Sequence, residues 1–142
     1  MTRFMLDTNI CIELLRTGSS KILARMRRYD IDQISISSIA LAELQFGAEK
    51  SGRPLYHKLL LAQFCAPIAV LSFDHIAAEC YGRVRTALER KGTPIGPLDT
   101  LIASHALALG VTLITNNERE FRRVAGLRIE NWSKSSPQRL GS

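Results

Sequence analysis

Short apolar segments with strand character alternate with helical patterns along almost the whole chain. Residues 4–6, 34–37, 68–71 and 111–115 are short and rich in apolar or β-branched residues, which is typical of strands. Between them, apolar residues recur at helical spacing. Strands that alternate with helices are joined by right-handed crossovers into a parallel sheet. The sequence therefore predicts an α/β fold, an α/β/α sandwich with a central parallel sheet of four to five strands flanked by helices.

Capping and helix-breaking residues predict the helix boundaries. Serine, threonine and aspartate cap helix N-termini, glycine often follows the last turn, and proline ends a helix or occupies its first turn. Ser38 is the expected start of the third helix. We expect helices over residues 10–17, 20–26, 39–49, 54–66, 75–90, 99–109 and 116–124, a glycine- and proline-rich loop at 91–98, and a short edge strand at 127–129.

Length and charge narrow the class of protein. The chain has 142 residues, one domain's length, and we expect a folded domain over residues 1–132 and a polar tail over 133–142. Nineteen Lys and Arg against thirteen Asp and Glu leave a net charge of +6, which favours a polyanionic partner such as nucleic acid. No apolar run reaches the roughly 18–20 residues of a membrane-spanning helix, and Asp7 comes too early for a secretory signal. We therefore expect a cytoplasmic protein with no membrane partner.

Polar residues directly follow two of the predicted strands. Asp7 comes after the first strand, and Asn116 and Asn117 come after the fourth. In open parallel sheets the ligand crevice lies beyond the carboxyl ends of the strands, near the point where the strand order reverses. Asp99 begins the helix that leads into the fourth strand, and Glu43 lies in the helix after the second. All of these residues are therefore candidates for one crevice.

Each of the three acids also has a simpler interpretation. Asp7 could serve only as a helix cap and Asp99 only as a partner of a helix dipole. Glu43 could be a partly exposed helix acid, although it shares a helical face with Ile39, Phe46 and Gly47. A carboxylate on such an apolar face is expected to be paired or metal-bound, because burying it alone is very costly.

Three carboxylates in one crevice would repel each other unless protons or a cation lay among them. Mg²⁺ or Mn²⁺ fits best, because hard divalent cations prefer oxygen ligands. Such a site can activate water and stabilise charge on a phosphodiester during its hydrolysis. The sequence contains no Ser/His/Asp or Cys/His arrangement that would offer competing chemistry.

Four segments, in this order along the chain, closely resemble PIN-domain toxins of the VapC type. They read MLDTN from Met5, AELQFGA from Ala42, GTPIGPLDTLIA from Gly92 and LITNNEREF from Leu113. The resemblance covers residues 1–132 and implies a PIN-like fold. It also implies the toxin of a type II toxin–antitoxin pair, a Mg²⁺- or Mn²⁺-dependent endoribonuclease. Such toxins are usually homodimers, silenced by a VapB antitoxin whose C-terminal segment occupies a groove. A tRNA anticodon region is the first expectation for the RNA substrate.

The resemblance also implies roles for individual residues. Asp7, Glu43 and Asp99 match the three acidic ligands of the family, which makes them the expected catalytic and metal-binding residues. Many PIN domains have a fourth acid after the last core strand, where this chain has Asn117, so either Asn117 or Glu120 could take that place. Supporting positions are expected at Thr8, Asn9, Thr115 and Asn116.

Four arginines are candidates for RNA binding, and solvated helix faces are the simpler interpretation for each: Arg25, Arg28, Arg83 and Arg85.

A phospho-accepting receiver domain has a similar size but would carry an acidic pair after the first strand, where this chain has Asp7 alone. A phosphatase with an Asp-x-Asp nucleophile fails for the same reason, because residue 9 is Asn. The remaining alternative is a non-catalytic PIN-like module that binds RNA or an antitoxin.

Overall fold

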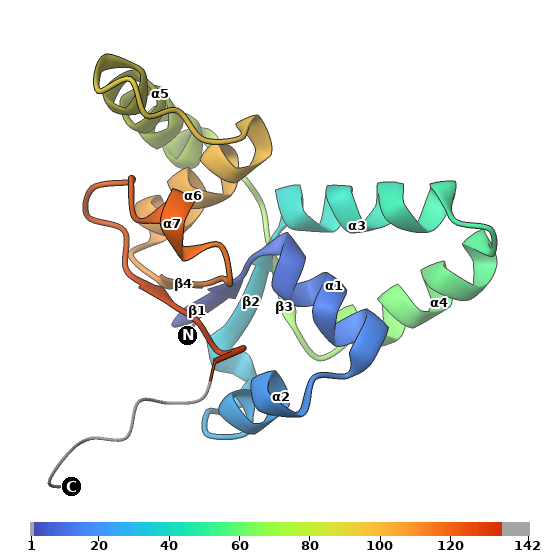
Figure 1. Cartoon of the computed structure of the whole chain (residues 1–142). Coiled ribbons are helices and arrows are strands. Elements are labelled where there is room, and N and C mark those ends of the chain that lie inside the picture. Colours follow the sequence, from blue (N-terminus) through green and yellow to red (C-terminus); the bar gives the residue numbers. More distant parts are fainter. Residues whose placement is uncertain (1, 135–142) are drawn as a thin grey trace, which may run out of the picture.

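A computed structural model of the chain describes residues 2–134. Within this range, five strands form one parallel sheet in the order β3-β2-β1-β4-β5 (Figure 1). The strands are β1 (Phe4–Leu6), β2 (Ile34–Ser37), β3 (Ala69–Leu71), β4 (Thr112–Ile114) and β5 (Ile129–Glu130). The central strand β1 has β2 on one side and β4 on the other, so the strand order reverses beside β1. The α/β prediction is confirmed.

The helices pack on both faces of this sheet. They are α1 (Thr8–Thr17), α2 (Ser20–Met26), α3 (Ser38–Lys50), α4 (Pro54–Cys65), α5 (His75–Arg90), α6 (Pro97–Leu109) and α7 (Glu118–Phe121), and a short 3₁₀ helix, η1, spans Ile31–Gln33. Side chains of β1 alternate between two cores. Phe4 and Leu6 face the core formed with α1 and α2, whereas Met5 faces the core formed with α5 and α6.

Local signals explain most of the boundaries. The Asp7 side chain caps α1, Gly18 ends it with φ +59°, and Asp74 caps α5, all as predicted. The cap of α3 is Ser37 instead of Ser38, because the Ser37 hydroxyl accepts from the Ile39 N–H. A serine therefore caps this helix, but one residue earlier than predicted.

Several predicted boundaries differ from the structure by one to three residues. Helix α6 begins at Pro97, two residues before the predicted start, because proline needs no hydrogen bond in the first turn. Helix α7 ends at Phe121, short of the predicted 124, and β5 starts at Ile129 instead of residue 127.

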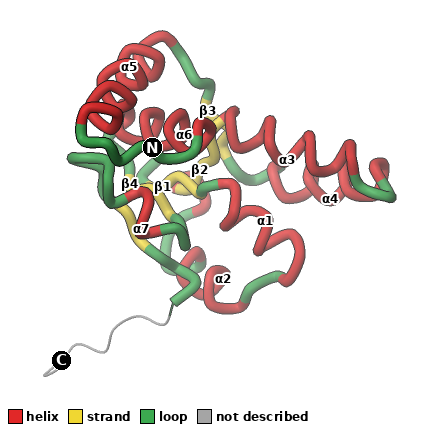
Figure 2. The backbone as a smooth tube through the Cα atoms, turned by 45° about the horizontal axis from the view of Figure 1, so that its top comes forward, coloured by secondary structure: helices red, strands yellow, loops and turns green. Residues whose placement is uncertain are grey.

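The buried face of α3 also differs from the prediction. Ala40, Leu44 and Ala48 are buried, while Phe46 on the predicted face is 65% exposed. The reason is tertiary: α3 and α4 form a hairpin that projects from the sheet, so the far part of α3 is covered by α4 and α1, while α6 and the sheet cover its start (Figure 2).

The end of the described chain packs against the domain. Trp132 is fully buried against Phe4 and Tyr29. Lys134 pairs with Glu118 at 2.7 Å. The remainder of the predicted polar tail, residues 135–142, lies outside the described residues. No helix in residues 2–134 is long and apolar enough to cross a membrane.

Candidate active site

Asp7 lies at the carboxyl end of the central strand and is 3% exposed. Its Oδ1 accepts a hydrogen bond of 2.8 Å from the Ile10 N–H, which caps α1. Its own N–H donates to the Ile114 carbonyl at 2.9 Å and thereby extends the pairing of β1 with β4. The position of this carboxylate is therefore set by the sheet and by α1 together.

Glu43 lies half-buried on α3 and meets the first turn of α1. The Thr8 Oγ1 donates to the Glu43 Oε1 at 2.7 Å, across 35 residues of sequence. The residue that directly follows Asp7 thus holds Glu43.

Asp99 is half-buried in the first turn of α6. The backbone passes close to its carboxylate: a Cβ at Gly96 would lie 3.5 Å from the Asp99 Oδ2. Thr100 fastens this turn, because its hydroxyl donates to the Gly96 carbonyl at 2.8 Å. The glycine- and proline-rich loop therefore leads directly into the helical turn that positions Asp99.

Residues after β4 complete the cluster. The buried Thr115 hydroxyl accepts from the Asn117 N–H at 2.9 Å, and the Thr115 side chain also hydrogen-bonds the Asp7 carboxylate. The Asn117 Nδ2 donates to the Glu120 Oε2 at 3.1 Å. Asn117 thus hydrogen-bonds the carboxylate of Glu120, whose charge acts on Asp99.

Electrostatics show that these four acids converge. The pKa of Asp7 is raised to about 6: burial and the negative charges of Asp99 and Glu43 raise it, while hydrogen bonds from Thr115 and Ile10 lower it. The pKa of Asp99 is raised first by burial and then by the charges of Glu120 and Glu43. Each of these acids lies within electrostatic reach of another, although they come from four different elements.

The cluster offers only oxygen ligands, which suits Mg²⁺ or Mn²⁺. Among residues 2–134, no three His, Cys, Asp or Glu side chains form a ready-made metal-binding group. Mg²⁺ does not require one, because it commonly uses one or two carboxylates and completes its shell with water and substrate phosphate oxygens. The residues therefore fit such an ion.

Other predicted residues are not part of this cluster. Asn9 and Asn116 are exposed beside it. The Arg25 guanidinium pairs with Glu130 at 3.2 Å, and Arg85 pairs with Glu89 at 3.0 Å. Arg25 lies on α2 and Arg28 just after it, whereas Arg83 and Arg85 lie on α5. These two helices lie at opposite ends of the molecule (Figure 1). The structure therefore does not gather the four arginines into one surface.

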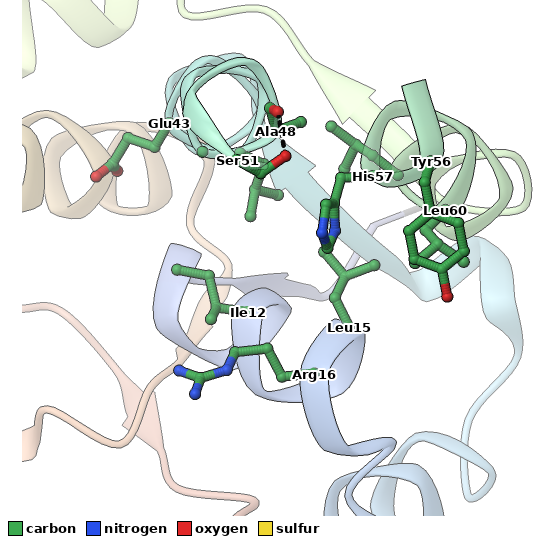
Figure 3. Close-up of a pocket in the computed structure, with 12 residues that line it drawn as sticks. Ile12, Leu15, Arg16, Glu43, Ala48, Ser51, Tyr56, His57 and Leu60 are labelled. Atoms are coloured by element: carbon green, nitrogen blue, oxygen red, sulfur yellow. Dashed lines mark hydrogen bonds between the residues drawn. The ribbon is translucent and has the colours of Figure 1, made fainter. Parts of the chain in front are cut away.

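A groove beside the acidic cluster was not foreseen from the sequence. It has a volume of about 510 Å³, lies between α1, α3 and α4, and is largely apolar. Figure 3 shows Glu43 at one end of the groove and Tyr56 and Leu60 at the other. The groove is lined by apolar side chains of all three helices, among them Ile12, Leu44 and Leu60.

Comparison with known proteins agrees with this geometry. The family model described as PIN domain matches residues 4–127. The tRNA(fMet)-specific endonuclease VapC of Shigella flexneri is 44% identical over 135 residues, which cover 94% of this chain and 100% of that protein. The chain belongs to the VapC family of PIN-domain ribonucleases. The predicted PIN-like fold and the predicted ribonuclease class are thereby confirmed.

Solved VapC structures have the same fold. The crystal structure of DNA-bound VapBC from Salmonella typhimurium matches with a TM-score of 0.90 and 44% identity over 93% of this chain and 99% of that one. VapBC2 from Rickettsia felis, bound to a DNA fragment from their promoter, matches with a TM-score of 0.85 and 40% identity over 92% and 99%. Ribonucleases of the PIN class generally depend on a divalent metal ion, which accords with the oxygen-rich cluster described above.

Proposed function

We propose that this VapC-family ribonuclease is the toxin of a type II toxin–antitoxin pair and cleaves RNA with Mg²⁺ or Mn²⁺ held by Asp7, Glu43, Asp99 and Glu120. The observation that carries the proposal is the gathering of these carboxylates at the carboxyl edge of the sheet, where the charges of Asp99 and Glu43 add to burial in raising the pKa of Asp7. Mutually repelling carboxylates at the carboxyl edge of a parallel sheet suit a bound cation and have no evident value for folding.

Each supporting residue has a definite task in this mechanism. Thr115 and the Ile10 N–H hold the Asp7 carboxylate, Thr8 holds Glu43, and Asn117 holds Glu120. When bound, the metal ion activates a water molecule and stabilises negative charge on the phosphodiester. The four acids come from separate elements, so the fold and not one helix brings them together.

We propose tRNA as the substrate class, with the anticodon region as the first candidate. Two relatives with 44% identity over more than nine-tenths of this chain are named as tRNA(fMet)-specific endonucleases. The net charge of +6 favours binding of a polyanion. The setting of this activity is the cytoplasm, where tRNA is available.

The partner proposed for the apolar groove is the C-terminal segment of a VapB-type antitoxin. Glu43 belongs both to the groove lining and to the acidic cluster, so a peptide that filled the groove would end against the carboxylates. Such a peptide would block both metal and RNA. In line with the family, the toxin is proposed to form a homodimer.

The decisive experiment uses the purified chain freed from antitoxin. Incubation with total tRNA should yield discrete fragments in Mg²⁺ or Mn²⁺ and none in EDTA, and sequencing of the new ends identifies the cut. If the folded protein binds RNA or antitoxin but leaves every RNA intact at all metal concentrations, the non-catalytic alternative is correct instead.

A further inference from the structure

A buried histidine links the two helices that carry Asp99 and Glu43. His105 lies in α6 and is only 2% exposed. Its Nδ1 lies 2.8 Å from the Oγ of Ser37, 68 residues away in sequence, and its ring packs edge-on against Phe73 with centroids 5.4 Å apart. Ser37 in turn is the N-cap of α3.

The hydrogen-bond roles in this contact follow from the neighbouring groups. His105 also has a backbone hydrogen bond with Ser72, and a neutral ring that donates there accepts from the Ser37 hydroxyl at Nδ1. The same Ser37 oxygen accepts from the Ile39 N–H at 3.0 Å. Burial lowers the pKa of His105 and so favours the neutral ring that this arrangement requires. Both ring nitrogens are occupied, and no part of the ring is available to a substrate.

On each helix the contact lies six residues from the acid. His105 follows Asp99 by six residues, and Glu43 follows Ser37 by six residues. At about 1.5 Å of rise per residue, each acid lies roughly 9 Å along its helix from the bond. A shift of α6 along α3 would therefore move Asp99 relative to Glu43 and would have to break this bond.

Apolar packing alone specifies this register weakly. The face that α6 buries is built from small residues as well as Ile102, among them Ala103 and Ala106. Small side chains interdigitate little, whereas a directional bond between buried polar groups selects one arrangement. A leucine in place of His105 would bury a similar area without selecting a register.

We propose that His105 is a positioning residue of the nuclease, which sets the separation of Asp99 and Glu43 by fastening α6 to the N-cap of α3. This inference rests on the proposed function, because it assumes that the two acids share a metal ion.

The test compares Mn²⁺ binding by the metal-free chain, measured calorimetrically without RNA, in wild type and three variants. His105→Leu removes the bond and keeps the volume apolar. His105→Asn keeps an acceptor near the Nδ1 position. Ser104→Ala is the matched control on the same helix, because the Ser104 hydroxyl donates only to the Thr100 carbonyl of its own helix, at 2.6 Å.

We expect His105→Leu to weaken Mn²⁺ binding about 10- to 100-fold, the range seen for groups that orient metal ligands. His105→Asn should recover most of that loss, and Ser104→Ala should bind as wild type does. At saturating metal, His105→Leu should lower kcat on tRNA and leave KM unchanged.

Two results would overturn the inference. The first is wild-type Mn²⁺ affinity in His105→Leu. The second is a loss of Mn²⁺ affinity that follows the fraction of protein unfolded in EDTA and that is not recovered in His105→Asn. His105 would then have a purely structural role. If the wild-type protein itself neither bound Mn²⁺ nor cut RNA, the proposed function would fail first, and this inference with it.

Discussion

The Thr8 hydroxyl donates to the Glu43 carboxylate at 2.7 Å, so the residue after the first acid of the cluster holds the second. The bond ties the start of α1 to the middle of α3. Asp7 is fixed at the same place by the Ile10 N–H at 2.8 Å. One turn of helix thus orients two of the four carboxylates, which makes the start of α1 the structural centre of the site.

Replacing Asp7 by Asn should abolish RNA cleavage and preserve the fold. Asn retains the oxygen that accepts from Ile10 and caps helices as well as Asp does. It removes the negative charge that the metal ion needs, so we expect kcat to fall by more than about 100-fold, beyond the usual effect of an outer-shell change. Fragment yield from tRNA and the melting temperature in EDTA measure the two effects. Cleavage at the wild-type rate would refute the assignment of Asp7.

Thr8→Val should weaken Mn²⁺ binding roughly 10- to 100-fold, because Glu43 loses the bond that orients it. Thr17→Val is the matched control: the exposed Thr17 hydroxyl donates at 2.8 Å to the Glu13 carbonyl within the same helix. Calorimetric titration with Mn²⁺ compares the two variants. Equal affinities would mean that the Thr8 bond does not orient a metal ligand.

Glu120→Gln should reduce metal affinity more than Asn117→Ala does. In the structure Glu120 carries the charge that acts on Asp99, and Asn117 only orients it through the 3.1 Å bond. Glu118→Gln is the control, since Glu118 lies on the same helix but pairs with Arg122 and Lys134. If Asn117→Ala had the larger effect, Asn117 itself would be the ligand.

The stability of the metal-free protein should decrease as the pH rises through the titration range of Asp7. The pKa of Asp7 is about 6 in the folded protein against 3.8 for a free carboxyl, so between these values the folded state holds a proton that the unfolded chain has lost. Unfolding is therefore favoured by rising pH, by about 3 kcal/mol over the full interval.

Urea unfolding in EDTA between pH 4 and 7 tests this dependence. Asp7→Asn is the reference, because titration of other groups, including His105, is common to both proteins and cancels in the difference. Mn²⁺ should restore the lost stability at pH 7 in the wild type alone, since it binds the ionised carboxylate. Parallel pH profiles of the two proteins would contradict the raised pKa.

Tyr56→Ala should weaken binding of a VapB-type antitoxin by at least about tenfold and leave RNA cleavage unchanged. Tyr56 lines the apolar groove, and aromatic groups dominate such interfaces. Leu55→Ala is the control, because Leu55 precedes it in the same helix, is 86% exposed and does not line the groove. The dissociation constant of each variant is measured by titration with the antitoxin. Equal losses of affinity in both variants would exclude the groove as the specific binding site.

Signals local to the chain were sufficient for the elements of the fold. Asp7 and Asp74 cap helices where the sequence places them, and Gly18 and Gly110 end helices with positive φ. These features depend on neighbours within one helical turn, so sequence patterns report them reliably. The cap of α3 moved by one residue to Ser37 because Ser37 and Ser38 are equally good caps and only packing distinguishes them.

By itself, the sequence predicted the strands, the helices and the candidate acids Asp7, Glu43 and Asp99. Only the tertiary structure decided which face of α3 is buried, that Glu120 joins the cluster while Asn117 orients it, and that an apolar groove ends at Glu43. The physical reason is the sequence separation of the residues that interact. Capping and periodicity depend on residues a few positions apart, whereas the convergence of four carboxylates depends on crossovers that bring residues 7 to 120 to one edge of a sheet.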